Sequence, residues 1–333
     1  MIDLPRELGE PSFRARQIAE WKYRKLAAGY ADMRNLPLAL REELARRLPF
    51  STLEPVQEIG SADAQTTKLL FRLEDGQLIE SVLMRHLDRG TVCVSSQAGC
   101  KMRCSFCATG HGGWRRNLTS DEIVDQVLHF GRLLKREHRH VTNVVFMGMG
   151  EPLDNYDAVL DAVRLLNAPG GMGLGARNIT VSTCGLVPEI RRLAGEPVQV
   201  NLAVSLAATT DDRRGELIPV NRRWPIRELL AACDEYARAT HRRVSFEYVL
   251  IAGVNDSLEE ADRLAGLLRG RLAHVNLIPL NPVEGDAYKR PEEPAIRRFE
   301  AVLQAARVPV SVRYSKGVDI VAGCGQLRAA ATA

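Results

Sequence analysis

Three cysteines lie close together in the segment GCKMRCSFCATG, where Cys100, Cys104 and Cys107 have the spacing C-x3-C-x2-C. Thiolates this close in one loop can converge on a single metal centre. A structural zinc ion takes four ligands, so zinc here requires Cys93 or His111 as the fourth ligand. An iron–sulfur cubane also usually takes four cysteines, and three cysteines leave one iron open to another ligand. The spacing predicts a metal centre and leaves both kinds open.

The chain around this segment alternates between strand-like and helix-like patterns. From Gly90 onward, apolar runs typical of strands are separated by amphipathic helical patterns. The strand candidates are TVCVSS, TNVVFMGM, NITVST, VNLAVSLA, RVSFEYVLI, HVNLIPLN and PVSVRYS. This alternation predicts an α/β fold with parallel strands, either a barrel or a doubly wound sheet. Both architectures carry their chemistry at the carboxyl ends of the strands, and the cysteine segment follows such an end.

Two shorter regions precede the alternating part. Residues 1–50 are rich in Arg, Leu, Ala and Glu at helical spacing and predict a small helical domain. Residues 51–89 contain KLLFRLEDGQ and LIESVLMRH, which predict a β-hairpin extension with its turn at EDG. Residues 90–328 then form the barrel domain. Its first helix, LTSDEIVDQV, is expected to open with a capping box that ends at Glu122.

Composition places the chain among ordinary globular proteins. It has 333 residues, of which 45% are hydrophobic and 26% charged, and its formal net charge is +4. No uncharged run reaches the roughly 18 residues of a spanning helix, and the amino terminus has no signal-peptide pattern. We therefore expect a cytoplasmic protein without membrane association. Seven cysteines in so large a chain predict metal-binding or catalytic roles more readily than disulfides.

Basic residues form short clusters despite the mild net charge. They are Arg115-Arg116, the run KREHRH at residues 135–140, Arg213-Arg214 and Arg222-Arg223. Most clusters of this kind are solvated surface, but the same residue types also contact nucleic-acid phosphates. Both interpretations stay open from the charge pattern alone.

The cysteine segment, with Phe106 before its last cysteine, resembles the cluster loop of the radical S-adenosylmethionine (SAM) superfamily. The resemblance implies a partial (β/α)6 TIM-like barrel in which Cys100, Cys104 and Cys107 hold a [4Fe–4S] cluster. It also implies that SAM binds the open iron and is cleaved by one electron to a 5′-deoxyadenosyl radical.

Polar and glycine residues at successive strand ends fit this resemblance. MGMGEP, residues 147–152, is similar to the superfamily's Gly-rich SAM-binding segment: its glycines allow close backbone approach, and its glutamate can accept hydrogen bonds from an ammonium group. Singly, such residues are commonly turn or cap residues. The SAM contacts that the resemblance implies are Gly150, Glu151, Ser182, Ser205, Leu206, Ala207 and Asn281.

Further segments make the resemblance more specific and extend it over nearly the whole chain. CVSSQAGCKMRCSFCATG, RRNLTSDEIVDQV, NVVFMGMGEPLDN, ITVSTCGLVPEI, LIPVNRRWPI, HVNLIPLNP and DIVAGCGQL occur in one order. They resemble the dual-specificity RNA methyltransferases, which methylate C2 of adenine 2503 in 23S ribosomal RNA and of adenine 37 in certain tRNAs. The resemblance implies this activity on 23S rRNA and tRNA, with a flavodoxin or ferredoxin as electron donor. It also implies that the helical domain of residues 1–50 is an RNA-binding accessory domain that contacts phosphates together with the arginine clusters. We expect the enzyme to act as a monomer.

The same resemblance implies roles for residues outside the triplet. Cys324 takes a methyl group from one SAM, and the radical from a second SAM removes hydrogen from that methyl group. The resulting methylene radical adds to adenine C2 and gives a covalent protein–RNA adduct. Glu80, which matches the family's proton acceptor, removes the C2 proton. Cys93 then attacks the Cys324 sulfur, which forms a transient disulfide and releases the methylated RNA. Cys184 and Cys233 are expected to be small buried side chains.

The sequence departs from the family pattern at two places and leaves two alternatives. Ser205-Leu206-Ala207 replaces the usual Ser-Leu-His, so any contact made by that imidazole is missing. Gly323 stands before Cys324 where alanine is frequent, which we expect only to loosen the loop. A sister group that methylates C8 of the same adenine uses the same cysteines, so the target carbon stays open. A non-enzymatic RNA-binding protein with zinc at these cysteines is the alternative from another class.

Overall fold

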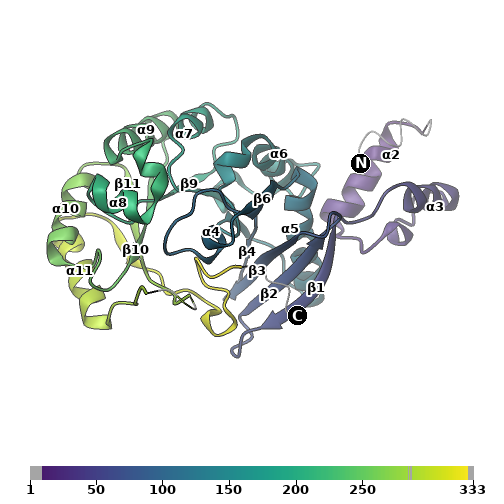
Figure 1. The fold of residues 1–333 in the computed structure, drawn as a ribbon. Coiled ribbons are helices and arrows are strands. Elements are labelled where there is room, and N and C mark those ends of the chain that lie inside the picture. The colour runs from purple at the N-terminus through teal and green to yellow at the C-terminus, as the bar shows by residue number, and fades with distance from the viewer. Residues whose placement is uncertain (1–9, 284, 286, 329–333) are drawn as a thin grey trace.

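One large sheet runs through the described part of the molecule, residues 10–283, 285 and 287–328 (Figure 1). In this computed structural model the sheet has ten strands, in the order β1-β2-β3-β4-β7-β8-β9-β10-β11-β12. Its first half comprises β1 (Leu53–Gly60), β2 (Thr66–Leu73), β3 (Leu78–His86), β4 (Arg89–Cys93) and β7 (Asn143–Phe146). Its second half comprises β8 (Ile179–Thr183), β9 (Asn201–Ser205), β10 (Val244–Leu250), β11 (Ala273–Pro279) and β12 (Val310–Val312).

Within this ten-stranded sheet, the strands from β4 to β12 are parallel, as the alternating pattern predicts. β4 pairs with β7, and each later strand pairs with the next in parallel register. The longer helices between them are α5 (Ser120–Arg136), α6 (Tyr156–Asn167), α7 (Val187–Ala194), α9 (Ile226–Thr240), α10 (Leu258–Leu268) and α11 (Glu293–Ala305), and the short α8 (Asp211–Leu217) precedes α9. Every strand candidate is a strand in the structure. The α/β prediction is confirmed in the form of an open, partial barrel.

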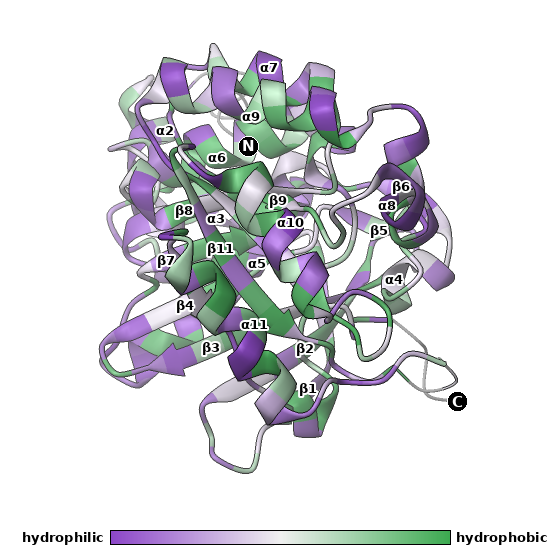
Figure 2. Ribbon diagram, turned by 90° about the vertical axis from the view of Figure 1, so that its left-hand side faces the viewer, coloured by the Kyte–Doolittle hydropathy of each residue, from purple (hydrophilic) through white to green (hydrophobic). Residues whose placement is uncertain are grey.

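The helices cover the sheet because each carries an apolar stripe. Figure 2 shows purple and green residues alternating along these helices. In α5, Ile123, Val127 and Leu134 are buried at helical spacing. The predicted capping box is present: the Thr119 hydroxyl accepts from the Glu122 amide, and the Glu122 carboxylate accepts from the Thr119 amide. Within the described ranges, no helix is both long enough and apolar enough to cross a membrane.

The extension between residues 51 and 89 is larger than the predicted hairpin. β2 and β3 pair antiparallel around the expected turn, and β1 adds a third antiparallel strand at the edge. β3 also pairs with β4, so the extension is continuous with the barrel sheet. The sequence does not reveal β1 because, of its residues, only Leu53 is buried and no apolar alternation marks the strand. Charged residues and Pro55 on such an exposed edge oppose pairing with another chain.

The helical segment before the sheet has a small core of its own. It contains α2 (Phe13–Ala19), a π-helical turn η1 (Glu20–Arg24), a 3-10 turn η2 (Tyr30–Asp32) and α3 (Leu38–Arg47). The buried apolar side chains that pack there are Ile18, Tyr30, Met33, Leu36, Leu40 and Leu44. A buried ion pair, with Lys22 Nζ 3.1 Å from Asp125 Oδ1 on α5, joins this segment to the barrel. The domain boundaries near residues 50 and 89 stay predictions, and residues 1–9 lie outside the described residues.

Candidate active site

A cavity of about 940 Å³ opens at the carboxyl ends of the barrel strands. We call it the cluster cavity, because Cys100, Cys104 and Cys107 line it. The other predicted site residues on its wall are Gly150, Glu151, Ser182, Ser205, Asn281 and Cys324. Parallel strands end at one edge of a sheet, so segments far apart in the sequence meet there.

The loop that carries the three cysteines lies between two short elements. β5 (Gln97–Gly99), which pairs with β6 (Trp114–Asn117), precedes it, and α4 (Ala108–His111) follows it. Burial is the main cause that raises the pKa of Cys100, to about 12, and burial with the two neighbouring thiols raises that of Cys104. Thiols crowded in this way become thiolates readily only beside a cationic centre. The donor set therefore fits a metal cluster.

The arrangement of ligands fits a cluster better than a single zinc ion. Within residues 10–283, 285 and 287–328, no three His, Cys, Asp or Glu side chains converge as ligands of one metal ion. Cys93, one candidate for a fourth zinc ligand, lines a different cavity. His111, the other, has its Nε2 3.0 Å from the Ser105 carbonyl oxygen. A [4Fe–4S] cubane binds each thiolate at a different iron, so its ligands spread over a wider frame.

Gly148 and Gly150 are required by the packing of the protein itself. A Cβ at Gly148 would lie 2.7 Å from the Val94 carbonyl oxygen, and one at Gly150 would lie 2.6 Å from Gln97 Cβ. Gly150 also has a φ of +101°, which other residues rarely adopt. We expected these glycines to let a ligand approach. The structure shows that they let the turn after β7 pack against the segment after β4.

Glu151 is buried and bound to main-chain donors. Its Oε1 accepts a hydrogen bond from Leu153 N at 3.0 Å, and its Oε2 accepts one from Cys184 N at 2.8 Å. Burial raises the pKa of Glu151, whereas these amides lower it. The carboxylate thus ties the end of β7 to the end of β8. The side chains of Cys184 and Thr183 also hydrogen-bond to this carboxylate and lower its pKa, and the contact with an ammonium group stays a prediction.

Asn281 lines the cluster cavity with an unused acceptor. Its amide nitrogen donates to the Ser315 hydroxyl at 2.7 Å and to the Cys324 carbonyl oxygen at 3.0 Å. Its Oδ1 is buried and has no hydrogen-bond partner among the described residues. A buried acceptor left in this state is costly unless a ligand supplies the donor. This free acceptor fits the predicted SAM contact and would join that contact to the Cys324 loop.

The segment Ser205-Leu206-Ala207 faces the cavity only in part. Ser205 lines the cavity, whereas Leu206 and Ala207 are fully buried and are not part of its wall. Arg214 secures the segment, because its guanidinium donates to the carbonyl oxygens of Cys184, Ser205 and Leu206. Arg214 is itself fully buried. The interpretation of Arg213-Arg214 as solvated surface is therefore wrong for Arg214.

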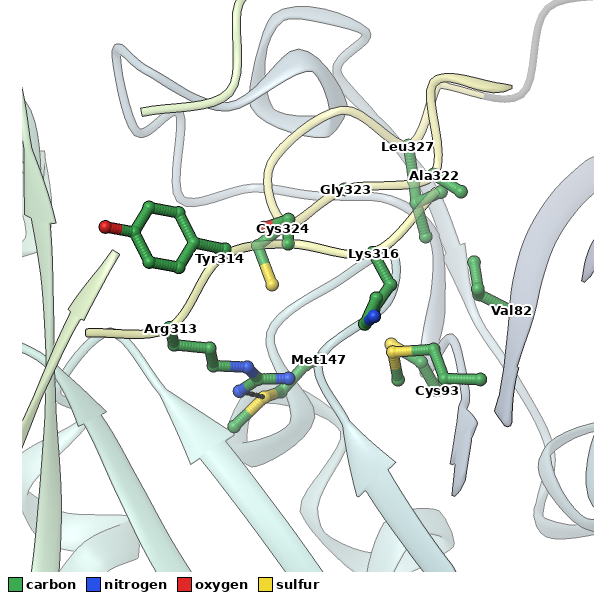
Figure 3. Close-up of a pocket in the computed structure, with 12 residues that line it drawn as sticks. Val82, Cys93, Met147, Arg313, Tyr314, Lys316, Ala322, Gly323, Cys324 and Leu327 are labelled. Carbon is green, nitrogen blue, oxygen red and sulfur yellow. Dashed lines mark hydrogen bonds between the residues drawn. The ribbon is translucent and has the colours of Figure 1, made fainter. Parts of the chain in front are cut away.

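A second, smaller cavity of about 480 Å³ lies between the extension and the carboxy-terminal loop. We call it the cysteine cavity, because Cys93 and Cys324 both line it. Figure 3 shows the Cys324 sulfur pointing into this cavity, with Arg313 and Met147 beside it and Cys93 across from it. Cys324 and Met147 line the cluster cavity as well. Of the predicted catalytic residues, Cys324 is the one that faces both cavities.

Arg313 places a positive charge beside the two thiols of the cysteine cavity. Its Nη1 lies 3.6 Å from Met147 Sδ. The charge of Cys324 is the main cause that raises the pKa of Arg313. Burial raises the pKa of Cys93 to about 12, and Arg313 opposes that rise without cancelling it. Cys93 therefore rests as a neutral thiol next to a guanidinium that favours its thiolate.

Hydrogen bonds fix the loop that carries Cys324 against the cluster loop. The Gly325 carbonyl oxygen accepts a hydrogen bond from Ala108 N at 2.8 Å, one residue after the last cysteine of the triplet. Gly323 also fits tightly, because a Cβ there would lie 2.9 Å from Asn281 Nδ2. The atoms nearest to such a Cβ belong to the side chains of Gln326 and Asn281, which can shift, so the expectation that this glycine only loosens the loop stays a prediction.

Glu80 lies beside the same loop in a buried ion pair. Lys68 Nζ is 3.0 Å from Glu80 Oε1 and 3.2 Å from the Val321 carbonyl oxygen. Glu80 Oε2 accepts a hydrogen bond from the Arg328 amide at 2.8 Å. Val321 and Arg328 flank Cys324 in the sequence, so one ion pair on the extension holds both ends of its loop. The role of Glu80 as proton acceptor stays a prediction.

Several residues of the two cavities escape the sequence analysis. Cys184 is buried, as Cys233 is, but Cys184 also lines the cluster cavity. Glu247 lines that cavity and Arg313 lines the other. A charged residue inside an otherwise apolar strand candidate is the signal that could have found both, in RVSFEYVLI and PVSVRYS. Of the basic clusters, Arg116 is engaged in ion pairs with acids of the extension and α5.

Comparison with known proteins identifies the family. The Radical SAM superfamily profile matches residues 94–265, and the ribosomal RNA large subunit methyltransferase N-terminal domain profile matches residues 1–48. A protein of Symbiobacterium thermophilum named "Probable dual-specificity RNA methyltransferase RlmN" is 50% identical over 329 residues, which are 98% of this chain and 88% of the relative. This chain belongs to the RlmN family of the radical SAM superfamily.

A second relative and a solved structure agree with the assignment. A Frankia alni protein of the same name is 52% identical over 331 residues, 97% of this chain and 79% of the relative. The crystal structure of a radical SAM methyltransferase from Sphaerobacter thermophilus is 56% identical, covers 98% of this chain and 96% of its own, and has a TM-score of 0.96. Radical SAM enzymes use a [4Fe–4S] cluster and SAM, and the cluster cavity has the donors for both.

Proposed function

We propose that this chain methylates C2 of adenine in 23S ribosomal RNA and in tRNA. The observation that carries the proposal is the position of Cys324, which lines both the cluster cavity and the cysteine cavity. A sulfur in that position can receive carbon from SAM on one side and deliver it to a base on the other. The names of the relatives, which describe dual-specificity RNA methyltransferases, support RNA as the substrate.

The proposal assigns each step to residues of this chain. Cys324 attacks the SAM methyl group as a thiolate nucleophile, and its sulfur keeps the carbon until the base arrives. The cluster and a second SAM, when bound at Cys100, Cys104 and Cys107, supply the one-electron chemistry that activates that carbon. The radical adduct loses one electron, which the oxidised cluster would accept, and Glu80 accepts the C2 proton. Cys93 then attacks the Cys324 sulfur: an S–S bond forms as the S–C bond breaks, and the released carbon takes up a proton to become the methyl group.

Exposed basic residues are the proposed contacts to the RNA backbone. Arg115, Arg213, Arg222 and Arg223 are exposed in the structure, in contrast to Arg214. Guanidinium groups on a surface bind phosphates and release counterions, so RNA binding should weaken steeply as salt rises. Presenting C2 also requires the adenine to leave its stack. We propose that a flavodoxin or ferredoxin supplies electrons in the cytoplasm, where the RNA substrates are.

Methylation of defined RNA tests the proposal directly. The enzyme is reconstituted anaerobically with iron and sulfide and is incubated with SAM, a reductant and either a 23S rRNA fragment or tRNA. We expect 2-methyladenosine in the nuclease digest of both RNAs, identified by mass spectrometry and by NMR of the nucleoside. A digest that contains 8-methyladenosine would assign the chain to the sister activity. A digest with no methylated adenosine would overturn RNA methylation itself.

A further inference from the structure

Tyr314 presents an exposed aromatic ring at the cysteine cavity. The residue lies two positions after β12, lines this cavity and is 41% exposed. Figure 3 shows its ring extending away from the Cys324 sulfur, whereas the neighbouring Arg313 extends toward Met147. The ring therefore lies at the rim of the cavity and leaves the space beside the reacting sulfur open.

Contacts with α11 hold the Tyr314 ring in one orientation. Its hydroxyl donates to the carboxylate of Glu293, whose two oxygens lie 2.6 and 2.8 Å away. Arg297 binds the same carboxylate at 2.8 Å, so the negative charge beside the ring is compensated. A ring that is fixed before binding loses little side-chain freedom when a ligand packs against it. The exposed ring is thus preorganised for a flat partner.

Two exposed cations share this rim with the ring. The guanidinium carbon of Arg290 lies 5.6 Å from the centre of the Tyr314 ring. Lys316 lines the same cavity, and its Nζ donates to Gln65 Oε1 at 3.1 Å. Proteins hold unpaired nucleotides by the same combination, in which aromatic rings stack on bases and cations bind the phosphates between them. The rim therefore has the chemistry of a single-strand contact.

The reaction explains why a nucleotide outside the cavity needs such a partner. The target adenine must leave its stack to bring C2 to Cys324. Its departure uncovers the faces of the bases on either side of it, which lose their stacking partner. A ring at the rim can cover one of these faces without entering the space that the target adenine needs.

We propose that Tyr314 stacks on the base next to the target adenine, while Arg290 and Lys316 bind phosphates of the same strand. The inference rests on the proposed function, because its ligand is the RNA that carries the target adenine. It adds a residue that guides the strand into the cysteine cavity. Stacking accepts any base, so Tyr314 selects for an unpaired neighbour and not for a particular sequence.

A cycle of protein and RNA changes tests the stacking by binding alone. The probe is a fluorescent 23S rRNA fragment that contains the target adenosine, and two further fragments carry an abasic residue directly 5′ or 3′ of it. Affinity for the anaerobically reconstituted holoenzyme is measured by anisotropy without SAM, at about 150 mM salt. We expect the wild type to bind one abasic fragment about 5- to 100-fold more weakly than the parent. Tyr314→Leu should bind these two fragments within about threefold of each other, since the base has lost its partner.

Two controls distinguish stacking from folding. Tyr314→Phe keeps the ring and should keep the wild-type discrimination against the abasic fragment. Tyr156 has similar partners, because its hydroxyl donates to Glu196 at 3.1 Å and the guanidinium carbon of Arg192 lies 3.8 Å from its ring centre. It is buried on α6 and lines a different, apolar cavity. Tyr156→Leu should lower the melting temperature and leave the discrimination unchanged, and Tyr156→Phe replaces it as the control if Tyr156→Leu does not fold.

The outcomes separate this inference from the proposed function. The stacking assignment is wrong if the wild type does not discriminate against either abasic fragment, or if Tyr314→Leu retains the wild-type discrimination. It is also wrong if Tyr314→Leu weakens binding of all three fragments by one factor, since Tyr314 then acts only on the shape of the rim. Methylation of the parent fragment by the wild type is measured separately. Methylation together with any of these results removes the inference and leaves the proposed function, whereas the expected cycle without methylated product does the reverse. A wild type that binds none of the fragments removes both.

Discussion

The two cavities that meet at Cys324 are built in different ways. The cluster cavity is formed by the ends of consecutive parallel strands and the loops that follow them. The cysteine cavity is formed by an antiparallel extension on one side and a loop near the carboxyl terminus on the other. The first uses the common position of chemistry in α/β barrels. The second depends on a few contacts between residues that are more than 200 positions apart in the sequence, such as Lys68 with Val321.

This difference suggests a division of labour within one enzyme. Strand ends give a rigid and general site for a cluster and SAM, whereas the extension and loop add a thiol that can exchange bonds. Cys324 belongs to both because its backbone is held by Asn281 of the cluster cavity while its sulfur points into the cysteine cavity (Figure 3). Each of the following predictions changes residues of one of the two cavities at a time.

The largest expected effect comes from replacing each of the two cysteines of the cysteine cavity by alanine, one at a time. Cys93→Ala should accumulate a covalent protein–RNA adduct, because no thiol is left to attack the Cys324 sulfur and break its bond to the RNA carbon. Cys324→Ala should give no adduct and no methylated RNA, since the carrier itself is missing. A denaturing gel with labelled RNA distinguishes the two. The same band pattern from both variants would contradict the roles assigned to them.

Arg214 tests the rigidity of the cluster cavity. Arg214→Met removes the guanidinium donor from the carbonyl oxygens of Cys184 and Ser205, at the ends of β8 and β9, so the free energy of unfolding should fall by about 4 kcal/mol. The measurement is denaturant unfolding of the holoenzyme, with affinity for S-adenosylhomocysteine as a second readout. Its neighbour Arg213 is the control, because it is exposed and its one ion pair among the described residues is with Glu216, at 2.8 Å. Arg213→Met should change stability by less than about 0.5 kcal/mol, and equal effects would refute the scaffold role of Arg214.

Lys68 tests how the extension holds the cysteine loop. Lys68→Met leaves Glu80 as a buried carboxylate without its cation and frees the Val321 carbonyl oxygen. We expect a loss of about 3 kcal/mol in the free energy of unfolding and slower RNA methylation, with iron content unchanged. The double variant Lys68→Met/Glu80→Gln should recover part of the stability but not the methylation rate. Iron loss in Lys68→Met would show that the two sides of the site are not separable.

The smallest effect concerns pH. Burial raises the pKa of Cys93 to about 12 from an ordinary value of 9.0, so the folded protein holds this group as a thiol over a pH range where the unfolded chain ionises it. The stabilisation is present below pH 9 and is lost as pH rises toward 12, by about 1.4 kcal/mol per unit. The difference in unfolding free energy between wild type and Cys93→Ala should therefore be flat from pH 7 to 8.5 and should shift against the wild type above pH 9. If the difference in unfolding free energy between wild type and Cys93→Ala stays constant up to pH 10.5, the raised pKa of a buried Cys93 thiol is contradicted.

The parts of the site that follow from local pattern are the ones that the sequence predicts well. Strand candidates, helices and the capping box depend on periodicity and on neighbouring residues, and the strand-end rule then collects Ser182, Ser205 and Asn281 around the cysteine triplet. β1 is not predicted because an exposed edge strand needs no apolar alternation. The Lys68–Glu80 pair and its two contacts with the loop are not predicted either, since nothing local in the sequence records a contact across the fold.

Charged residues within predicted strands show more clearly what local sequence patterns cannot predict. Glu247 and Arg313 break apolar strand patterns, and a local rule treats each as a solvent-facing position. The structure turns both inward, one to each cavity. Only the shape of the open barrel, which depends on all of its strands together, decides that these positions face a cavity and not solvent.

Transfer of labelled carbon through Cys324 tests the central claim most directly. The reconstituted enzyme is given SAM with a labelled methyl group and no RNA, is freed of excess SAM, and then receives RNA, reductant and unlabelled SAM. Mass spectrometry of the peptide that contains Cys324 follows the label before and after the chase. We predict one labelled methyl group on Cys324 that leaves the protein and appears in the RNA during the first turnover. Label that stays on Cys324 while unlabelled methyl groups enter the RNA would contradict a sulfur that carries carbon from one cavity to the other.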